Sequence, residues 1–189
     1  MDAFEYIEFA DKANLILNGN AGDDVISLNY GTTPRLLTAI TVNGNDDNDT
    51  IDLHAAAVAT LTVNGDAGSD DARVSGAGIG TFNAADLTLN VEIVAFDIDG
   101  SVAGTGYDQI VAAGSVDITG TTLLVGGTHS PSAGESYTLI DATSAVTGTF
   151  AGLADGATVS ADFLGSGLTA TITYMGGDGF DVVIEIESA

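Results

Sequence analysis

Three segments of this chain repeat the same pattern and align with one another without gaps. They run from Leu15 to Leu28 (LILNGNAGDDVISL), from Ile40 to Leu53 (ITVNGNDDNDTIDL) and from Leu61 to Val74 (LTVNGDAGSDDARV). Each contains β-favouring residues, an Asn-Gly pair, a polar turn that ends in Asp, and a second alternating strand. The offsets of 25 and 21 residues correspond to one supersecondary unit per repeat. Repetition at this period is typical of a chain that stacks successive units on one another.

Two all-β architectures are compatible with the repeat. Asn-Gly is a strong signal for a two-residue hairpin, which favours a meander or a sandwich, and the uneven repeat lengths also favour it. However, five residues separate Gly19 from Val25, so a corner between stacked strands fits better. We therefore predict an all-β fold, a right-handed parallel β-helix (β-solenoid). In it, Asn18, Asn43 and Asn64 form one hydrogen-bonded ladder at about 4.8 Å per coil.

The pattern of the chain changes near residue 104. We assign residues 1–103 to repeat-bearing coils, and residues 104–189 to terminal coils and a C-terminal cap of the same solenoid. The segment Leu168–Tyr174 alternates apolar residues with three threonines, and Ile184–Glu187 alternates isoleucine with glutamate, as half-buried strands do. A cap is expected because an open solenoid end exposes a row of unpaired backbone groups.

Charge and composition exclude several classes of protein. The 189 residues include 27 acidic and 3 basic ones, for a formal net charge of −24, while 45% are hydrophobic. The apolar content excludes a disordered acidic tail. The scarcity of cations excludes a nucleic-acid binder, and an anionic membrane would repel the chain. Without cysteine there is no disulfide or thiolate metal site. No apolar run is long enough to cross a bilayer, and the acidic N-terminus does not have the pattern of a signal peptide.

The corners resemble the calcium-binding nonapeptide of RTX-type repeats, Gly-Gly-x-Gly-x-Asp-x-apolar-x. Gly176–Ile184 (GGDGFDVVI) matches it at every fixed position. Partial matches are found at Gly19–Ser27, Gly44–Asp52, Gly65–Arg73 and Ala103–Val111. In that family the repeats run in tandem and two corners face each other, whereas here one corner occurs per coil. The resemblance implies that the corner aspartates bind calcium.

Elementary electrostatics also favours a cation at stacked corners. Asp24, Asp49 and Asp70 occupy equivalent positions, and carboxylates about 4.8 Å apart repel one another by roughly 1 kcal/mol in water. Calcium binds carboxylate and turn carbonyl oxygens. The alternative is that these residues only close Asx-turns on a solvated edge. We predict Ca²⁺ as the cofactor, with the ligands Asp24, Asp49, Asp70, Asp108, Asp181, Asp23, Asp47, Asp66 and Asp178.

From about Gly104 to Ile186 the chain resembles the terminal part of autotransporter-like β-helical passengers of bacterial surfaces. The motifs that carry the resemblance are GYDQ at 106–109, GESYTLID at 134–141, GTFAGL at 148–153 and ITYMGGDGFDVV at 172–183, in this order. The resemblance implies a β-helix that ends in a capping region. It also implies an extracellular or cell-surface location.

Residues that typically carry catalysis are scarce. His54 and His129 are isolated in the sequence and are interpreted as loop residues, and no Gly-x-Ser-x-Gly elbow is present. We therefore expect a non-enzymatic, calcium-stabilised structural or adhesive module outside the cell. The alternative is a protein that binds or cleaves an acidic polysaccharide, for which Lys12, Arg35 and Arg73 are the available cations.

The chain starts with an apolar, strand-like segment that contains Phe4, Tyr6, Ile7 and Phe9. We expect these four residues to mediate self-association through solenoid ends. Such contacts give a homo-oligomer or, where head-to-tail contacts do not close, a filament or surface layer. A surface glycan is the other partner considered. Neither nucleic acid nor membrane insertion is expected.

Overall fold

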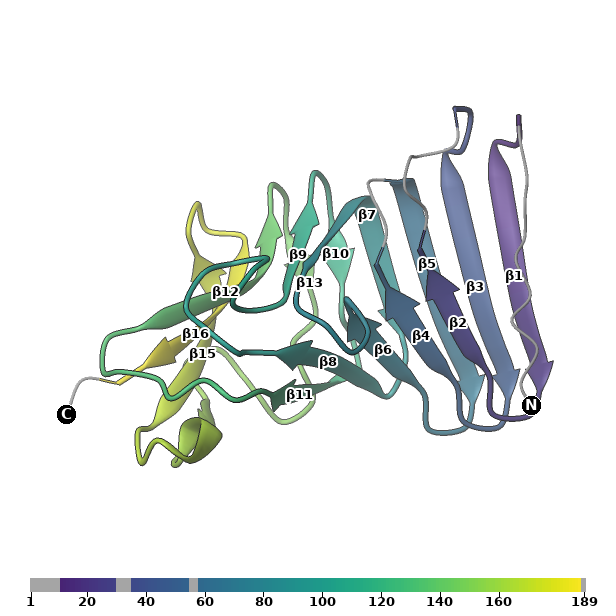
Figure 1. Cartoon of the computed structure of the whole chain (residues 1–189). Coiled ribbons are helices and arrows are strands. Elements are labelled where there is room, and N and C mark those ends of the chain that lie inside the picture. The colour runs from purple at the N-terminus through teal and green to yellow at the C-terminus, as the bar shows by residue number, and fades with distance from the viewer. Residues whose placement is uncertain (1–10, 30–34, 55–57, 188–189) are drawn as a thin grey trace.

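A computed structural model describes residues 11–29, 35–54 and 58–187. These residues form sixteen strands and one short 3₁₀ helix, arranged in two sheets (Figure 1). Sheet A has the strand order β1-β3-β5-β7-β9-β12-β16-β15-β14, with β10 and β13 beside it, and sheet B has the order β11-β8-β6-β4-β2. From β1 to β9 successive strands alternate between the two sheets, so the chain winds as a two-sheet β-solenoid. The predicted solenoid is confirmed over the sandwich.

Four coils stack from the N-terminal end, from right to left in Figure 1. Each has a longer strand in sheet A, a corner and a shorter strand in sheet B. The pairs are β1 (Asn14–Ala21) with β2 (Val25–Leu28), β3 (Ala39–Asp46) with β4 (Thr50–Leu53), β5 (Val58–Ala67) with β6 (Asp71–Val74), and β7 (Thr81–Asn90) with β8 (Ile93–Asp97). Neighbouring coils pair in parallel in both sheets.

The strand register reproduces the repeat that the sequence predicts. Leu15 pairs with Ile40, and Ile40 pairs with Leu61, which are the expected offsets. Alternate residues of each strand point between the sheets, and there Ile40, Val42, Leu61 and Val63 are at most 1% exposed. Their burial, at about 25 cal/mol per Å² of apolar surface, is the main stabilising term of the stack.

Two further coils continue the solenoid across residue 104. The fifth contains β9 (Gln109–Ala112), β10 (Val116–Asp117) and β11 (Thr122–Gly126). Strands β9 and β10 pair with the two halves of β7, and β11 pairs with β8. The sixth begins with β12 (Ser136–Ala142) and β13 (Val146–Thr147), which pair with β9 and β10. The repeat-bearing and terminal segments thus share the same two sheets.

Antiparallel strands close the C-terminal end, which lies opposite the N-terminal coil in Figure 1. They are β14 (Thr158–Ser160), β15 (Ala170–Gly176) and β16 (Asp181–Ile186), with the 3₁₀ helix Phe163–Gly165 between β14 and β15. Strand β16 pairs with β12, and β15 and β14 follow it. The predicted alternation and cap are confirmed. The strand begins at Ala170, two residues later than predicted. Leu168 lies in the turn beside the 3₁₀ helix, where its carbonyl oxygen accepts the N–H of Phe163.

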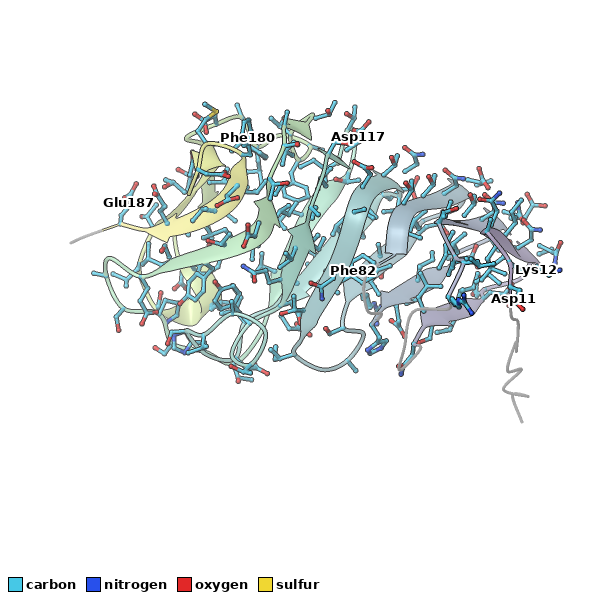
Figure 2. The ribbon with its side chains drawn as sticks, turned by 90° about the horizontal axis from the view of Figure 1, so that it is seen from above. Asp11, Lys12, Phe82, Asp117, Phe180 and Glu187 are labelled. Atoms are coloured by element: carbon cyan, nitrogen blue, oxygen red, sulfur yellow. The ribbon has the colours of Figure 1, made fainter. Side chains whose placement is uncertain are left out.

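The described residues contain no helix with the length and apolar character needed to cross a membrane. Figure 2 shows the solenoid from above, with Asp11 and Lys12 at its N-terminal end and Phe180 and Glu187 at the capped end. Phe82 lies between them, at the middle of the molecule. Its side chain is fully buried.

Candidate functional site: the stacked corners

The corners that connect sheet A to sheet B form a row along the lower edge of the solenoid in Figure 1. Each of the first four corners follows an asparagine in the last part of a sheet A strand. The side chain Nδ2 of Asn43 donates to Oδ1 of Asn18, Asn64 donates to Asn43, and Asn90 donates to Asn64, each at 2.8 Å. The predicted ladder is confirmed, and Asn90 is a fourth member that the sequence analysis missed. Its signal was the segment LTLN at 87–90, which repeats LTVN at 61–64.

Asp24, Asp49 and Asp70, here called the inner column, close each corner. The backbone N–H of Asp24 donates to Oδ1 of Asp49 at 2.8 Å, and that of Asp49 donates to Oδ1 of Asp70 at 2.7 Å. The N–H of Asp70 in turn donates to Oε2 of Glu92 at 3.0 Å. The carboxylates of Asp49, Asp70 and Glu92 therefore each accept a hydrogen bond from the backbone of the preceding coil. Glu92 was not predicted, because its corner is shorter and lacks the Gly-rich pattern.

The glycine of each Asn-Gly pair makes room for the inner column. Oδ2 of Asp49 and Oδ2 of Asp70 are buried without a hydrogen-bond partner. A Cβ atom on Gly44 would lie 2.2 Å from Asp49 Oδ2, and one on Gly65 would lie 2.4 Å from Asp70 Oδ2. Neither glycine has a positive φ. The Asn-Gly pairs are thus required by close packing, with a glycine C–H directed at the oxygen, and they do not form hairpin turns.

The inner column concentrates negative charge inside the protein. Asp70 is fully buried, and this burial raises the pKa of its carboxyl group. The neighbouring carboxylates of Glu92 and Asp49 raise that pKa further, while the hydrogen bond from the N–H of Asp49 opposes the shift. The backbone hydrogen bond from Asp49 is thus the main interaction that offsets the cost of desolvating the ionised Asp70 carboxylate.

Asp23, Asp47 and Asp66, here called the outer carboxylates, lie exposed on the same corners. Oδ1 of Asp23 accepts the N–H of Asn48 at 3.0 Å, and Oδ2 of Asp47 accepts the N–H of Gly22 at 3.1 Å. Oδ2 of Asp66 accepts the side-chain amide of Asn45 at 3.4 Å. Each of these bonds uses a single carboxylate oxygen, and the side chains face solvent.

The remaining predicted ligands lie away from this row. Asp108, just before β9, accepts the N–H groups of Gly80 at 2.9 Å and Asp97 at 2.8 Å, one on each oxygen. Its burial, together with the nearby charges of Asp97 and Asp99, raises the pKa of Asp108 to about 6.

In the cap, Asp181 accepts the N–H of Ala142 at 3.1 Å, and burial raises its pKa. Asp178 accepts the N–H of Phe180 at 3.3 Å. The structure therefore distributes the nine predicted ligands over three separate places in the fold.

In the inner column, the carboxylates of Asp49 and Asp70 are engaged with protein atoms. In each of them one oxygen accepts a backbone N–H of the preceding coil, and the other oxygen packs against glycine. Within residues 11–29, 35–54 and 58–187, no three His, Cys, Asp or Glu side chains are arranged to hold a metal ion. The outer carboxylates, in contrast, belong to exposed side chains.

A second candidate site is a cleft of about 360 Å³ in the cap, lined by Glu135, Glu185 and Glu187 together with the hydroxyls of Ser136 and Thr171. The sequence analysis singled out none of these side chains. They offer several hydrogen-bond acceptors to a cationic or hydroxyl-rich ligand.

Glu135 is held in place by two neighbours. Oε2 of Glu135 accepts the hydroxyl of Tyr137 at 2.6 Å and lies 3.0 Å from Nε2 of His129. The hydrogen bond from Tyr137 is the main cause that lowers the pKa of Glu135. This side chain is therefore a fixed carboxylate and a poor proton donor.

The three basic residues lie elsewhere. Arg73 pairs with Asp71 at 3.1 Å, and Lys12 and Arg35 are exposed. None of them lines the cleft. The predicted self-association residues Phe4, Tyr6, Ile7 and Phe9 fall outside the described residues.

No protein-family model, curated protein or solved structure matches this chain.

Proposed function

We propose that this protein is an extracellular structural or adhesive β-solenoid module that is stabilised by calcium and self-associates through one end of the solenoid. The observation that carries the proposal is the difference between its two ends. At the C-terminal end the antiparallel strands β16, β15 and β14 cover the edge of sheet A, whereas at the N-terminal end β1 and β2 are the edge strands of the two sheets among the described residues.

The N-terminal face consists of the outer edges of β1 and β2 and the side chains Leu15, Leu17 and Ile26. Among the described residues, β1 pairs only with β3, and β2 pairs only with β4. The three side chains are partly buried, whereas their register partners Ile40, Val42 and Ile51 in the next coil are at most 1% exposed. Unpaired sheet edges over an apolar cross-section favour association with another β-structure.

A structural role is supported by how the coils are joined. Every boundary between the first four coils carries the asparagine ladder and the inner column or its Glu92 extension, in addition to parallel strand pairing. Such nearest-neighbour contacts suit a rod whose stability is the sum of its repeats. The extracellular location is supported by the resemblance of residues 104–186 to surface passengers.

Calcium stabilisation is supported by the outer carboxylates and by the net charge of −24. Asp23, Asp47 and Asp66 present solvent-facing carboxylate oxygens on successive corners, where a hard cation reduces the repulsion between coils.

Sedimentation velocity at increasing protein concentration tests the self-association. We expect larger species for the intact chain and their loss in Leu17→Glu, which places a charge on the N-terminal face. Met175→Glu is the matched control, because Met175 is 69% exposed on the capped end. Only monomers at every concentration, in the intact chain and in a chain without residues 1–10, would refute the proposal.

Glycan binding is a second candidate function, favoured by the cleft of the cap and its mixture of hydroxyls and carboxylates. Because the cleft is acidic and lacks a basic residue, a neutral glycan fits it better than an acidic polysaccharide. Calorimetric titration with neutral and acidic oligosaccharides, using the intact chain and Glu185→Gln, tests this alternative. If neither class of oligosaccharide gives a heat of binding, the glycan-binding function is contradicted.

A further inference from the structure

We propose that Asn18 is a site of spontaneous deamidation, and that the asparagine ladder protects Asn43 and Asn64 from the same reaction. The inference concerns the chemical lifetime of the chain and goes beyond the proposed function. It starts from the sequence, in which each of these three asparagines is followed by glycine. Glycine has no side chain to hinder its own backbone nitrogen when that nitrogen attacks the preceding asparagine side chain.

The reaction needs no partner other than water. The backbone nitrogen of Gly19 attacks Cγ of Asn18 and forms a C–N bond, while the bond between Cγ and Nδ2 breaks. The proton of the Gly19 N–H leaves with Nδ2 as part of ammonia, and a five-membered succinimide ring remains. Water then opens the ring at one of its two carbonyl carbons, which gives aspartate or isoaspartate. The first step requires the side-chain amide to rotate toward the following nitrogen, which an extended strand opposes.

The amides of Asn43 and Asn64 are each held by two hydrogen bonds. Nδ2 of Asn43 donates to Asn18, and its Oδ1 accepts from Asn64, each at 2.8 Å. Asn64 donates to Asn43 and accepts from Asn90 in the same way. Both residues lie in strands with a neighbour on each side, β3 and β5, and the glycines that follow them are buried. Rotation of either amide therefore breaks two bonds inside a packed corner.

Asn18 is held less firmly. Its Oδ1 accepts from Asn43, whereas its Nδ2 donates to no acceptor in the described part of the chain. The Asn18 side chain is exposed, and Gly19 is half-buried. Within the described ranges, strand β1 pairs only with β3, and an edge strand opens at a lower free energy than a strand between two neighbours. The ladder therefore leaves its first member as the Asn-Gly pair that reacts.

The two products differ in their effect on the first coil. Aspartate at position 18 keeps an oxygen that accepts the side-chain amide of Asn43. Isoaspartate instead routes the backbone through its β-carbon, which adds one atom to the main chain before Gly19. This displaces the end of β1 relative to β3, where Asn20 pairs with Asn45. We expect the isoaspartate product to lose the pairing beyond the modified residue.

Peptide mapping of the full chain tests the inference. Trypsin cleaves after the three basic residues and places Asn18 in the peptide 13–35. Asn43 and Asn64 fall in the next peptide, where fragmentation separates them. Native protein and protein unfolded in guanidinium chloride are incubated in mildly alkaline buffer and analysed by mass spectrometry for deamidation and isoaspartate. The unfolded chain supplies the intrinsic rate of each Asn-Gly pair.

We expect similar rates at the three pairs in the unfolded chain. In the native chain, Asn43 and Asn64 should react at least about tenfold more slowly than Asn18, which corresponds to about 1.4 kcal/mol in the free energy of opening. Asn18→Gln is the matched variant, because its longer side chain cannot close a five-membered ring, and it should abolish the modification of its peptide. Asn90→Ala removes the hydrogen bond to Oδ1 of Asn64 and should accelerate the reaction at Asn64 without changing that at Asn18.

Three results would overturn the inference. The first is a native chain in which Asn18 reacts no faster than Asn43 and Asn64. The second is deamidation of the peptide 13–35 that continues in Asn18→Gln. The third is an unchanged rate at Asn64 in Asn90→Ala, with far-UV circular dichroism showing that the variant is folded, because it would remove the protective role of the ladder.

Discussion

The backbone N–H of Asp49 donates to the Oδ1 atom of Asp70 across 21 residues of sequence, at 2.7 Å. The same contact, from Asp24 to Asp49, joins the first two coils at 2.8 Å. Asp49 and Asp70 therefore each bind the preceding coil through one carboxylate oxygen and pack against a glycine through the other. This geometry assigns the recurring Asn-Gly and Asp pattern to coil stacking.

Removal of the Asp70 carboxylate should destabilise the protein strongly. Asp70→Ala leaves the buried N–H of Asp49 without an acceptor, which lowers the free energy of unfolding by about 2–3 kcal/mol. Asp70→Asn keeps an acceptor oxygen and removes a desolvated charge, so its loss should be smaller. Urea denaturation measures both, with the exposed Asp46→Ala as control. Equal midpoints for Asp70→Ala and the control would contradict the capping role.

Gly44 should not tolerate even a methyl group. In Gly44→Ala, the new Cβ would lie 2.2 Å from Asp49 Oδ2 and 2.8 Å from the carbonyl oxygen of Gly65. The corner must shift, and we expect a loss of about 1–3 kcal/mol in the free energy of unfolding. Gly78→Ala is the matched control, because its nearest neighbour would be 3.9 Å away and its φ is not positive. Similar denaturation midpoints for the two variants would show that the packing argument fails.

Calcium should raise the thermal midpoint through the outer carboxylates. A ligand that binds only the folded state adds RT ln(1 + [L]/Kd) to its stability. We expect the midpoint to rise with added Ca²⁺ and fall with EDTA, and this response to disappear in the combined variant Asp23→Asn, Asp47→Asn, Asp66→Asn. The combined variant Asp49→Asn, Asp70→Asn should keep it. Sodium chloride at matched ionic strength is the control, and an equal rise with sodium would indicate screening without binding.

The sequence predicted the solenoid because its repeat is itself the strand register. Asn18, Asn43 and Asn64 align at the offsets at which they stack, so the ladder and the stacking of the first three coils followed from spacing alone. The cap was visible in the alternation of Ile184 and Glu185. Asn90 and Glu92 were not predicted as corner residues, because their corner is shorter and lacks the glycine that is present in the other three.

The distribution of the predicted ligands could not be read from the sequence. Asp108 and Asp181 share the local Gly-x-Asp pattern with the inner column, but this pattern reports only that a carboxylate closes a turn on backbone N–H groups. The same contact is made at a different corner and in a hairpin of the cap. Likewise, Glu135, Glu185 and Glu187 meet only because β12 and β16 pair, which no local pattern indicates.

Acidification from neutral pH should first stabilise the protein, and Asp108 supplies the main term. Its pKa is about 6 in the folded chain, above the unfolded value of 3.8, so the folded state binds this proton more tightly. Its contribution is fully present below the unfolded pKa and is lost as the pH rises through about 6. The raised pKa values of Asp70 and Asp181 act in the same direction. The lowered pKa values of Asp99 and Glu135 oppose them, because their contribution is lost as the pH falls below about 4.

Together these shifts predict maximal stability near pH 5. Between pH 7 and pH 5 we expect the free energy of unfolding to rise by on the order of 1 kcal/mol from Asp108 alone. Asp108→Asn cannot titrate, so its stability curve should be flatter over this interval, although its midpoint is lower because one of the two N–H groups loses its acceptor. Asp46→Asn, an exposed change of the same kind, should keep the slope of the intact chain. Urea denaturation at pH 7, 6 and 5 measures these slopes. If the free energy of unfolding of Asp108→Asn depends on pH as steeply as that of the intact chain, a group other than Asp108 causes the stabilisation by acid.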